Sequence, residues 1–392
     1  MTDRPALLGG RPVFETVVPI LRPTLPSAEA YIPHLRQILE TGQITNAANV
    51  RAFEAECAER LGVKHCVAVS SCTLGLALTF KALEVTGPVV LPSFTFSASG
   101  HAVMWNGLRP VFVDCLPDTW NIDPALAADA VSKNGAILAT HLFGNPADCD
   151  ALEAVARDRG VPLIFDAAHG FGSVYQGRPV GCRGTAEVFS LSPTKLLVSG
   201  EGGLVATNED ELARRLRIGR NYGDPGNYDC EFPGLNARMS EFHAILGRLS
   251  LQTVDAGVAR RNAIAHTFEE RLGGLPGLQF QVIADSDRST YKDFSLIVHA
   301  DEFGMTRDDL GRSLQAENIQ TRFYFYPPLH RQRAYAAYRD ETVVPITDAL
   351  SDNVISLPIY ARLTDAETDG ICRAIERTHA HAGALAGQAA AA

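Results

Sequence analysis

The chain has 392 residues, 46% of them hydrophobic, which is enough for a globular protein of two or three structural domains. Its 35 basic and 45 acidic side chains give a formal net charge of −10, and the sequence contains no concentrated Lys/Arg tract. This charge distribution argues against nucleic acid and anionic membrane surfaces as partners.

The eight cysteines are scattered, without a CxxC pair or a Cys/His cluster at metal-ligand spacing. We therefore expect reduced thiols and no metal site. The N-terminal sequence lacks an apolar signal core, and no apolar run reaches the ~18 residues that a membrane span requires. A cytoplasmic location is expected.

Apolar, β-rich runs alternate with helical patterns from about residue 50 to residue 250. Strands are predicted at residues 64–70, 87–93, 109–115, 135–143, 161–168, 187–192 and 203–208. Several are unbroken apolar runs bounded by turn residues, as in parallel strands buried on both faces. Helices are predicted at residues 50–62, 74–84 and 148–160, with Gly62 and Gly160 as C-terminal stops. This alternation predicts an α/β fold with a sheet and crossover helices.

A long helical pattern at residues 238–273 is followed by a different order of predicted strands and helices. A strand at 294–300, a helix at 306–317 and a strand at 320–325 predict a second, smaller α+β domain. The predicted divisions are an N-terminal arm at residues 1–30, a large domain at 31–255 and a small domain at 256–392. The Ala- and Gly-rich tail after Thr378 is expected to fray.

Two charged residues of the first domain follow strand-like runs. Asp166 ends VPLIFD, where the carboxyl edge of a parallel sheet meets the ligand crevice, although it could instead cap the next helix. Lys195 follows EVFSLS and lies between the small residues SPT and the apolar residues 196–198. Most lysines are solvated surface charges, but a partly desolvated lysine has a lowered pKa and can act as a nucleophilic amine. The glycines after Lys195 would allow backbone or a flat ligand to approach closely.

A third element runs from a strand into a helix through Ser70, Ser71, Cys72 and Thr73. Hydroxyls and free backbone N–H groups at a helix N-terminus suit a phosphate, although an ordinary Ser/Thr N-cap has the same sequence and Cys72 could be a buried filler. A strand-end acid, a desolvated lysine and a phosphate cradle on one sheet would together bind pyridoxal phosphate.

Seven motifs, in this order, resemble those of the DegT/DnrJ/EryC1/StrS family of sugar aminotransferases, from about Gly9 to His379. They lie at residues 41–54, 69–76, 91–99, 165–173, 190–203, 234–247 and 322–330. The resemblance implies an aspartate-aminotransferase-like fold (fold type I), whose large domain carries a mostly parallel seven-stranded sheet. It also implies pyridoxal 5′-phosphate as cofactor and a homodimer whose subunits share their active sites.

The resemblance assigns roles to individual positions. Lys195 matches the lysine that attaches the cofactor and moves the proton, and Asp166 matches the acid that pairs with the pyridine nitrogen. Phe96 matches the aromatic that stacks on the cofactor ring, although such a Phe is more often a core residue. The expected contacts of the cofactor phosphate are Cys72, Thr73, Ser190 and, across the dimer interface, Asn236 of the partner subunit.

His169 matches a position beside the cofactor that is histidine in relatives aminating C4 of the sugar and glutamine in many that aminate C3. It is therefore assigned to the catalytic and cofactor-binding residues, although it could simply satisfy a nearby hydrogen bond. Lys195 excludes a sugar 3-dehydratase, because those relatives carry histidine there. Two positions depart from the pattern: Cys72 adds a side chain where backbone approaches the phosphate, and Ser192 replaces a frequent histidine.

The expected reaction is a ping-pong transamination from L-glutamate to a nucleotide-linked keto-deoxysugar. The first-choice acceptor is dTDP-4-keto-6-deoxy-D-glucose, which would give the 4-amino-4,6-dideoxy sugar. The alternatives are amination at C3 or of a cyclitol ketone, and a non-catalytic regulatory protein that holds pyridoxal phosphate. The nucleotide, the axial or equatorial product and the pathway, whether antibiotic deoxysugar or surface glycan, are left open.

The sugar diphosphate needs positive and hydrogen-bonding groups at the site. The candidates are Arg220, Arg238, Arg322, Tyr324, Tyr326 and His330. Each charged candidate could instead form an ordinary surface or interface ion pair.

Overall fold

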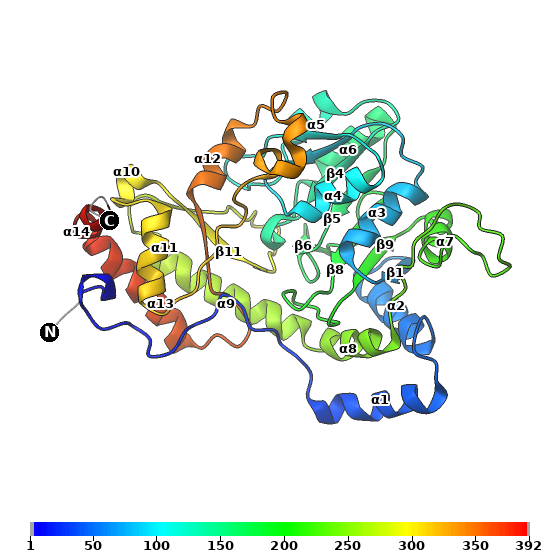
Figure 1. The fold of residues 1–392 in the computed structure, drawn as a ribbon, viewed down its shortest axis with the longest axis horizontal. Helices are drawn as coiled ribbons and strands as arrows, with labels where there is room; N and C mark the ends of the chain where they lie inside the picture. The colour runs from blue at the N-terminus through cyan, green and yellow to red at the C-terminus, as the bar shows by residue number, and fades with distance from the viewer. Residues whose placement is uncertain (1–3, 390–392) are drawn as a thin grey trace.

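The structure is a computed structural model that describes the backbone of residues 4–389 and the side chains of residues 4–385. Its elements in chain order are η1 (Ala6–Leu8), α1 (Ala28–Thr41), α2 (Ala48–Leu61), β1 (His65–Val69), α3 (Cys72–Ala82), β2 (Val89–Pro92), α4 (Ser97–Trp105), β3 (Pro110–Val113), α5 (Pro124–Ala130), β4 (Ala136–Thr140), η2 (Leu142–Gly144), α6 (Cys149–Arg159), β5 (Leu163–Asp166), β6 (Val174–Tyr175), β7 (Arg178–Pro179), β8 (Ala186–Ser190), β9 (Gly203–Thr207), α7 (Asp210–Gly219), α8 (Glu241–Leu251), α9 (Val254–Leu272), β10 (Leu278–Phe280), β11 (Phe294–Val298), α10 (Ala300–Phe303), α11 (Arg307–Ala316), η3 (Leu329–Arg331), η4 (Arg333–Tyr338), α12 (Pro345–Asn353), β12 (Val354–Leu357), α13 (Asp365–Ala380) and α14 (Ala382–Ala389). Figure 1 shows α7 at one end of the molecule and α11 and α13 at the other, with α8 and α9 running between them.

Seven strands form the central sheet, in the order β1-β9-β8-β5-β4-β2-β3. The neighbours β3, β2, β4, β5 and β8 are parallel, whereas β9 runs antiparallel to both β8 and β1. Each of the seven segments predicted as a strand contributes one strand to this sheet. The predicted α/β fold with a mostly parallel seven-stranded sheet is confirmed.

Both faces of the sheet are buried, because alternate residues of each strand enter different cores. Cys66 and Ala68 of β1 join a core with α2, α6 and α8, while Val67 and Val69 join a core with α3, α4 and α7. The unbroken apolar runs in the sequence follow from this two-sided burial. Gly62 and Gly160 end α2 and α6 with φ of 67° and 64°, so both predicted helix stops are confirmed.

The predicted helical stretch at residues 238–273 is two helices rather than one. Gln252 and Thr253 separate α8 from α9, and the Thr253 hydroxyl donates a 2.9 Å hydrogen bond to the carbonyl of Ser250. The Ser250 hydroxyl in turn accepts a 3.0 Å bond from the Val198 backbone N–H. Such Ser and Thr bonds to the backbone compete with the helical pattern, and the apolar periodicity on either side conceals the break.

The small domain is built on an antiparallel sheet with strand order β10-β11-β12, packed with α9, α11 and α13 in a separate core. The strand predicted at residues 320–325 is wrong. Only Arg322 forms a bridge there, to Ser356 of the unpredicted strand β12. The chain turns instead, because the Tyr326 N–H donates a 2.7 Å bond to the carbonyl of Phe323.

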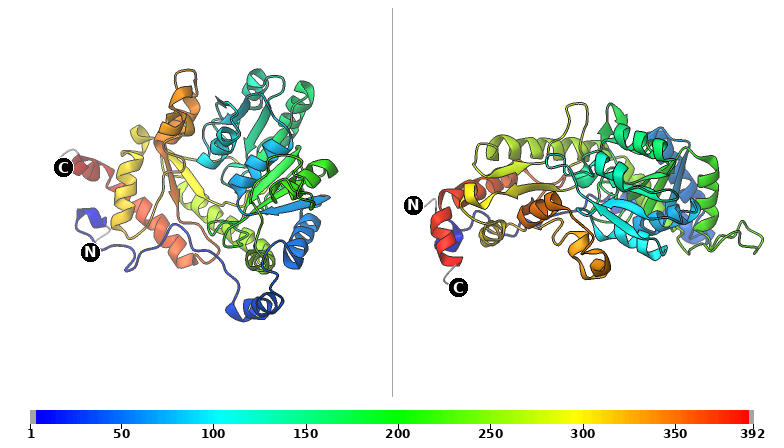
Figure 2. Two further views of the ribbon diagram at one scale, coloured as in Figure 1. Left: turned by 45° about the vertical axis from the view of Figure 1, so that its right-hand side comes forward. Right: turned by 90° about the horizontal axis from the view of Figure 1, so that it is seen from above.

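The predicted domain boundaries remain predictions. Residues from one predicted domain pack against residues of another. The backbone N–H groups of Ala6 and Val13 each donate a 2.9 Å bond to the Glu317 carboxylate, and Val18 is buried in the small-domain core. The N-terminal segment accordingly runs beside the small domain in both views of Figure 2. Tyr335 of η4, from the C-terminal part of the chain, is buried among residues of the large domain.

After Thr378 the chain is helical, since α13 continues to Ala380 and α14 follows at residues 382–389. Alanine is the strongest helix former, which explains why this Ala-rich segment is helical. Residues 390–392 lie outside the described part of the chain.

All eight cysteines are free thiols. Within residues 4–389, no helix combines the length and the apolar character needed to cross a membrane. Over the same residues, no group of three or more His, Cys, Asp and Glu side chains is placed to bind a metal ion.

Candidate active site

A cavity of about 400 Å³ lies at the carboxyl ends of β4, β5 and β8, where the large and small domains meet. This is the place where open α/β sheets bind ligands. It is lined by Ser71, Cys72, Thr73, Thr95, Phe96, Ala98, Thr140, Asp166, Ala168, His169, Ser190, Ser192, Thr194, Lys195, Glu201, Gly202, Lys292, Asp293, Tyr324 and Phe325. The predicted lysine, strand-end acid and hydroxyl-rich helix start therefore converge on one cavity.

Lys195 lies in the loop between β8 and β9, where its backbone N–H donates a 3.0 Å bond to the carbonyl of Ser192. Burial, reinforced by the positive charge of Lys292, lowers the pKa of Lys195 to about 8. The neutral, nucleophilic amine is therefore far more populated near neutral pH than in an ordinary lysine. The desolvation inferred from its apolar neighbours is present in the structure.

Asp166 is the last residue of β5 and only 3% exposed. Its carboxylate accepts a 2.6 Å hydrogen bond from the Ser99 hydroxyl and a 3.2 Å bond from the Ala168 N–H. Burial raises the pKa of Asp166, and these two bonds and the charge of Lys195 oppose that shift. A carboxylate held this way can pair with a positively charged group of a ligand.

The N-terminus of α3 opens on the cavity. The Ser71 hydroxyl caps the helix by accepting a 3.2 Å bond from the Leu74 N–H, while Thr73 and Ser190 line the cavity. The N–H groups of the first helical turn lack intrahelical acceptors and are suited to an anion. Gly203 lets the start of β9 lie directly against this turn, because an added Cβ would come within 2.6 Å of the Cys72 nitrogen.

The Cys72 side chain points inward rather than toward an anion at the helix terminus. Its sulfur lies 3.6 Å from the carbonyl oxygen of Val188 and 3.9 Å from Asp166 Oδ1. Burial, together with the Asp166 charge, keeps the pKa of the thiol well above its usual value, so the group is a neutral thiol. A phosphate contact by Cys72 is thereby limited to its backbone, and the side chain is a buried filler behind Asp166.

Among the described residues, four aromatic rings line the cavity, those of Phe96, His169, Tyr324 and Phe325. Phe96, 57% exposed, stands at the start of α4, with its ring centre 6.0 Å from that of Phe325. His169 is buried beside Phe143 and Phe325, whose ring centres lie 6.2 and 6.4 Å from its own and 5.7 Å from each other. Phe96 is therefore a surface of the cavity and not a core residue.

His169 is neutral and its tautomer is fixed. Burial lowers its pKa well below the usual value. The backbone N–H of Phe143 donates a 3.2 Å bond to His169 Nδ1, which leaves the ring proton on Nε2. His169 thus both lines the cavity and satisfies a buried amide, so the two roles considered for it are compatible.

The small domain supplies a buried ion pair that sequence reasoning missed. Lys292 and Asp293 are 7% and 8% exposed, and Lys292 Nζ lies 2.8 Å from Asp293 Oδ1. The Lys292 ammonium also lies 5.5 Å from the ring centre of Tyr324. The sequence feature that could have identified this pair is the adjacent Lys and Asp immediately before the apolar strand β11. Surface residues show the same pattern, so it does not single out a site.

Two of the predicted substrate contacts, Arg220 and His330, do not line the cavity of their own chain. Arg220 is buried away from the cavity, where it forms an ion pair with Glu54 and donates a 2.6 Å bond to the carbonyl of Ala68. His330 is also buried, with Nδ1 2.8 Å from the Ser93 hydroxyl and Nε2 3.3 Å from Asp348. Both side chains are engaged in holding the fold, which the sequence could not reveal because their partners are distant along the chain.

The remaining predicted substrate contacts are Arg322, Tyr324 and Tyr326, and only Tyr324 lines the cavity. Tyr324 lines the cavity, and Arg322 lies close enough to its hydroxyl to lower the Tyr324 pKa, although burial raises it overall. Tyr326 is instead partly exposed outside the cavity, where the guanidinium of Arg307 lies 4.3 Å from its ring centre. Of this group, Tyr324 is directly placed to meet a ligand.

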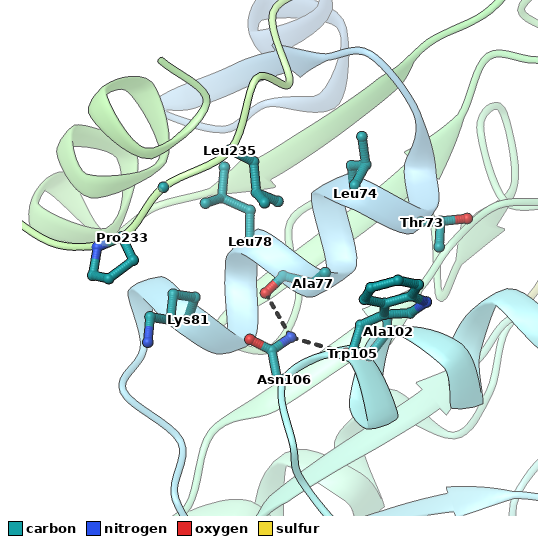
Figure 3. Close-up of a pocket in the computed structure, with 11 residues that line it drawn as sticks. Thr73, Leu74, Ala77, Leu78, Lys81, Ala102, Trp105, Asn106, Pro233 and Leu235 are labelled. Carbon is teal, nitrogen blue, oxygen red and sulfur yellow. Dashed lines mark hydrogen bonds between the residues drawn. The ribbon is translucent and has the colours of Figure 1, made fainter. Parts of the chain in front are cut away.

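A second cavity, of about 480 Å³, adjoins the first, and Thr73 lines both. Figure 3 shows its apolar walls, formed by side chains of α3 and of the segment at residues 233–235, and Trp105 beside them. Trp105 is 85% exposed. Neither Lys195 nor Asp166 lines this cavity, so the chemistry of the site belongs to the smaller one.

Asn236 and Arg238 come just after residues 233–235, which line this second cavity. Asn236 is exposed and lies outside the first cavity of its own chain. Arg238 donates a 2.7 Å bond to the Asn221 side chain and lies 5.6 Å from the ring centre of Tyr222. Neither residue contacts the first cavity within one chain.

The donor set of the first cavity fits pyridoxal phosphate. Lys195 offers an amine for its aldehyde, and Asp166 offers a buried carboxylate for a protonated ring nitrogen. The start of α3 with Thr73 and Ser190 suits its phosphate, and Phe96 offers an aromatic surface for its ring.

Known proteins are similar to this chain over almost its whole length. The model of the DegT/DnrJ/EryC1/StrS aminotransferase family matches residues 27–376. The dTDP-4-amino-4,6-dideoxy-D-glucose transaminase of Escherichia coli is 30% identical over 356 residues, which cover 90% of this chain and 96% of that protein. The dTDP-3-amino-3,4,6-trideoxy-alpha-D-glucose transaminase of Streptomyces venezuelae is 35% identical over 335 residues, covering 84% and 86%. The crystal structure of DesI in the presence of its TDP-sugar product aligns with a TM-score of 0.91 at 34% identity, over 99% of both chains.

The sequence motifs, the sheet topology and the cavity agree with these likenesses. The chain therefore belongs to the DegT/DnrJ/EryC1/StrS aminotransferase family and is a pyridoxal 5′-phosphate-dependent sugar aminotransferase of fold type I.

Proposed function

We propose that the protein transfers the amino group of L-glutamate to C4 of dTDP-4-keto-6-deoxy-D-glucose. The products are 2-oxoglutarate and dTDP-4-amino-4,6-dideoxy-D-glucose, so one amino group and one keto oxygen exchange places. The observation that carries the chemistry is the convergence of Lys195 and Asp166 on one cavity of about 400 Å³. A regulatory protein without turnover would not require a lysine whose pKa is held near 8.

The cofactor, when bound, supplies an electron sink for the negative charge that develops on a carbon losing its proton. Asp166 would hold its ring nitrogen, and Thr73, Ser190 and the N–H groups at the start of α3 would hold its phosphate. Phe96 would cover its ring.

Lys195 is the proton carrier of the proposed reaction. Its neutral amine accepts a proton at Nζ from the α-carbon of the amino donor, and the resulting ammonium returns that proton during the transfer. Ping-pong exchange then needs the same Nζ to give a proton to C4 of the sugar in the second half-reaction. The lowered pKa of Lys195 suits both directions, because it brings loss and gain of the Nζ proton much closer to neutral pH than in an ordinary lysine.

His169 supports amination at C4. It presents a neutral, stacked ring to the cavity, at the position where resemblance associates histidine with C4 aminotransferases. The E. coli relative is named for a 4-amino sugar. Amination at C3 is the second candidate, favoured by the S. venezuelae relative, which is named for a 3-amino sugar.

A homodimer with shared sites is also part of the proposal. The apolar second cavity, the exposed Trp105 and the exposed Asn236 lie along one stretch of surface next to Thr73. A second copy of the chain covering this surface would bury apolar area and bring Asn236 of the partner subunit toward the phosphate end of the first cavity.

Product analysis tests the substrate assignment. The purified protein with pyridoxal phosphate is incubated with L-glutamate and either dTDP-4-keto-6-deoxy-D-glucose or its 3-keto isomer, and the position of the new nitrogen is determined by NMR. Amination of the 4-keto sugar at C4 is the expected result. Turnover of the 3-keto isomer alone would replace this assignment with the C3 alternative.

A further inference from the structure

The Lys292–Asp293 ion pair is placed inside the reaction cavity and is held there by the backbone. The Lys292 N–H donates a 2.8 Å bond to the carbonyl of Phe143, which belongs to the large domain. The Lys292 carbonyl accepts a 3.0 Å bond from the buried guanidinium of Arg261. With 7% and 8% exposure, both charged side chains are withdrawn from bulk water.

The cavity has few positive charges to offer a substrate. Among the described residues that line it, the lysine and arginine side chains are Lys195 and Lys292, and His169 is neutral. Lys195 is committed to the cofactor and to proton transfer. An amino acid donor brings at least one carboxylate into this space, and Lys292 is the cation that remains to receive it.

The acceptor sugar does not need a cation at this place, because its reacting end carries no carboxylate. Both substrates occupy the same cavity in turn, so a cation placed there for the donor would be left unpaired and desolvated when the sugar is bound. An unpaired buried charge is strongly unfavourable. Asp293 removes this difficulty, since its carboxylate lies 2.8 Å and 3.0 Å from Lys292 Nζ.

We propose that Lys292 is the residue that binds a carboxylate of the amino donor, and that Asp293 is its built-in counterion while the sugar is bound. The ion pair opens for the donor and closes for the acceptor. This inference rests on the proposed function, in which the donor is an amino acid. It deepens that proposal by naming the residues that let one cavity accept both an anionic and an uncharged reacting group.

Asp293 keeps a positive neighbour when Lys292 turns to a ligand. Burial lowers the pKa of Arg261, and the negative charge of Asp293 counteracts that shift, so the two groups interact electrostatically. The Arg261 guanidinium is itself fixed by bonds to the carbonyls of Tyr291 and Lys292. Arg261 therefore remains a positive neighbour of Asp293 in both arrangements, and only the partner of Lys292 changes.

Two substitutions with opposite expected effects test this exchange. The probe is glutarate, which has the two carboxylates of glutamate without the amino group, and its binding to the holoenzyme is measured by calorimetry. Lys292→Met should weaken glutarate binding by roughly tenfold or more, as expected for loss of a charge-assisted hydrogen bond. Asp293→Asn should tighten it, because the internal competitor for the ammonium is removed. Lys292→Arg should retain most of the affinity, and Lys133→Met, at an exposed lysine, is the matched control.

A purely structural ion pair predicts a different pattern, in which both variants weaken glutarate binding together. That result, or unchanged binding in Lys292→Met, would overturn the inference. The half-reactions provide a second readout. The KM for L-glutamate should rise roughly tenfold or more in Lys292→Met, while the KM for the sugar, measured with enzyme loaded with pyridoxamine phosphate, should change by less than about threefold.

The wild-type protein separates failure of this inference from failure of the proposed function. If wild-type enzyme reacts with L-glutamate and Lys292→Met does so with the same KM, only the carboxylate-binding role falls. If wild-type enzyme reacts with no carboxylate-bearing donor, the proposed function falls, and the inference falls with it.

Discussion

The Ser99 hydroxyl donates a 2.6 Å hydrogen bond to the carboxylate of Asp166. Both side chains are buried, and the donor comes from α4 while the acid ends β5. The bond orients the carboxylate and opposes the effect of burial, which raises the Asp166 pKa. Ser99 therefore positions the acid that would hold the ring nitrogen of the cofactor.

Replacing Ser99 by alanine should slow turnover without unfolding the protein. Loss of the donor raises the Asp166 pKa further, so a larger fraction of the acid is protonated and cannot stabilise a positive ring nitrogen. We expect kcat to fall roughly tenfold, the effect of one hydrogen bond to a charged group. The acidic limb of the pH profile should also move to higher pH. Ser97→Ala, on the same helix but outside the cavity lining, is the control and should leave both quantities unchanged.

The pH dependence of cofactor attachment should report the Lys195 pKa. Attachment to the apoprotein needs the neutral amine, whose fraction is one half at the pKa of about 8 and levels off only at higher pH. The rate should therefore increase through neutral pH with a midpoint near 8. Lys292→Met should shift this midpoint upward, because a positive neighbour is removed and the Asp293 carboxylate is left facing Lys195. A midpoint that stays in place or falls would contradict this electrostatic coupling.

Arg220 should matter for stability and not for substrate affinity. Arg220→Met leaves Glu54 buried without its cation, which costs about 3–5 kcal/mol of unfolding free energy. Adding Glu54→Gln should recover part of this loss, because the neutral side chain can still accept the 2.8 Å bond from the Ala68 N–H. Denaturant unfolding measures the stabilities, with Arg157→Met as the exposed control. A large increase in the sugar KM of a folded Arg220→Met protein would support the substrate role instead.

The large domain was predictable because its strands are buried on both faces. Segments such as 64–70 and 161–168 show this burial as unbroken apolar runs, and the sequence order of runs and helices corresponds to the crossovers. The break at Thr253 and the turn at Phe323 were not predictable in the same way. Both depend on single hydrogen bonds to the backbone, which leave the apolar pattern unchanged.

The site was predictable where local sequence carries the chemistry. Asp166 ends a strand, Thr73 lies in the first turn of a helix and Lys195 lies in the loop after a strand, and these positions meet at one edge of the sheet. Lys292 and Asp293 reach the same cavity from the other domain, and Arg220 and His330 turn away from it. Their roles depend on contacts between segments far apart in the chain, which no local pattern records.

Mixing two variants tests whether the sites are shared between subunits. Lys195→Ala and Asn236→Ala proteins should each have little activity alone. In a randomly reassociated equimolar mixture of dimers, about a quarter of the sites would combine an intact lysine with an intact partner asparagine. Recovery of activity toward that fraction supports Asn236 acting across the interface. An additive, uncomplemented mixture would place each site within a single chain.

The most direct test of Lys195-dependent transamination is the visible absorption of the protein loaded with pyridoxal phosphate, recorded as L-glutamate and then dTDP-4-keto-6-deoxy-D-glucose are added. The cofactor band should disappear with glutamate and return with the sugar in the wild-type protein, and Lys195→Ala should show neither change. A wild-type band that is unaffected by glutamate, or a Lys195→Ala protein that completes both steps, would contradict the account.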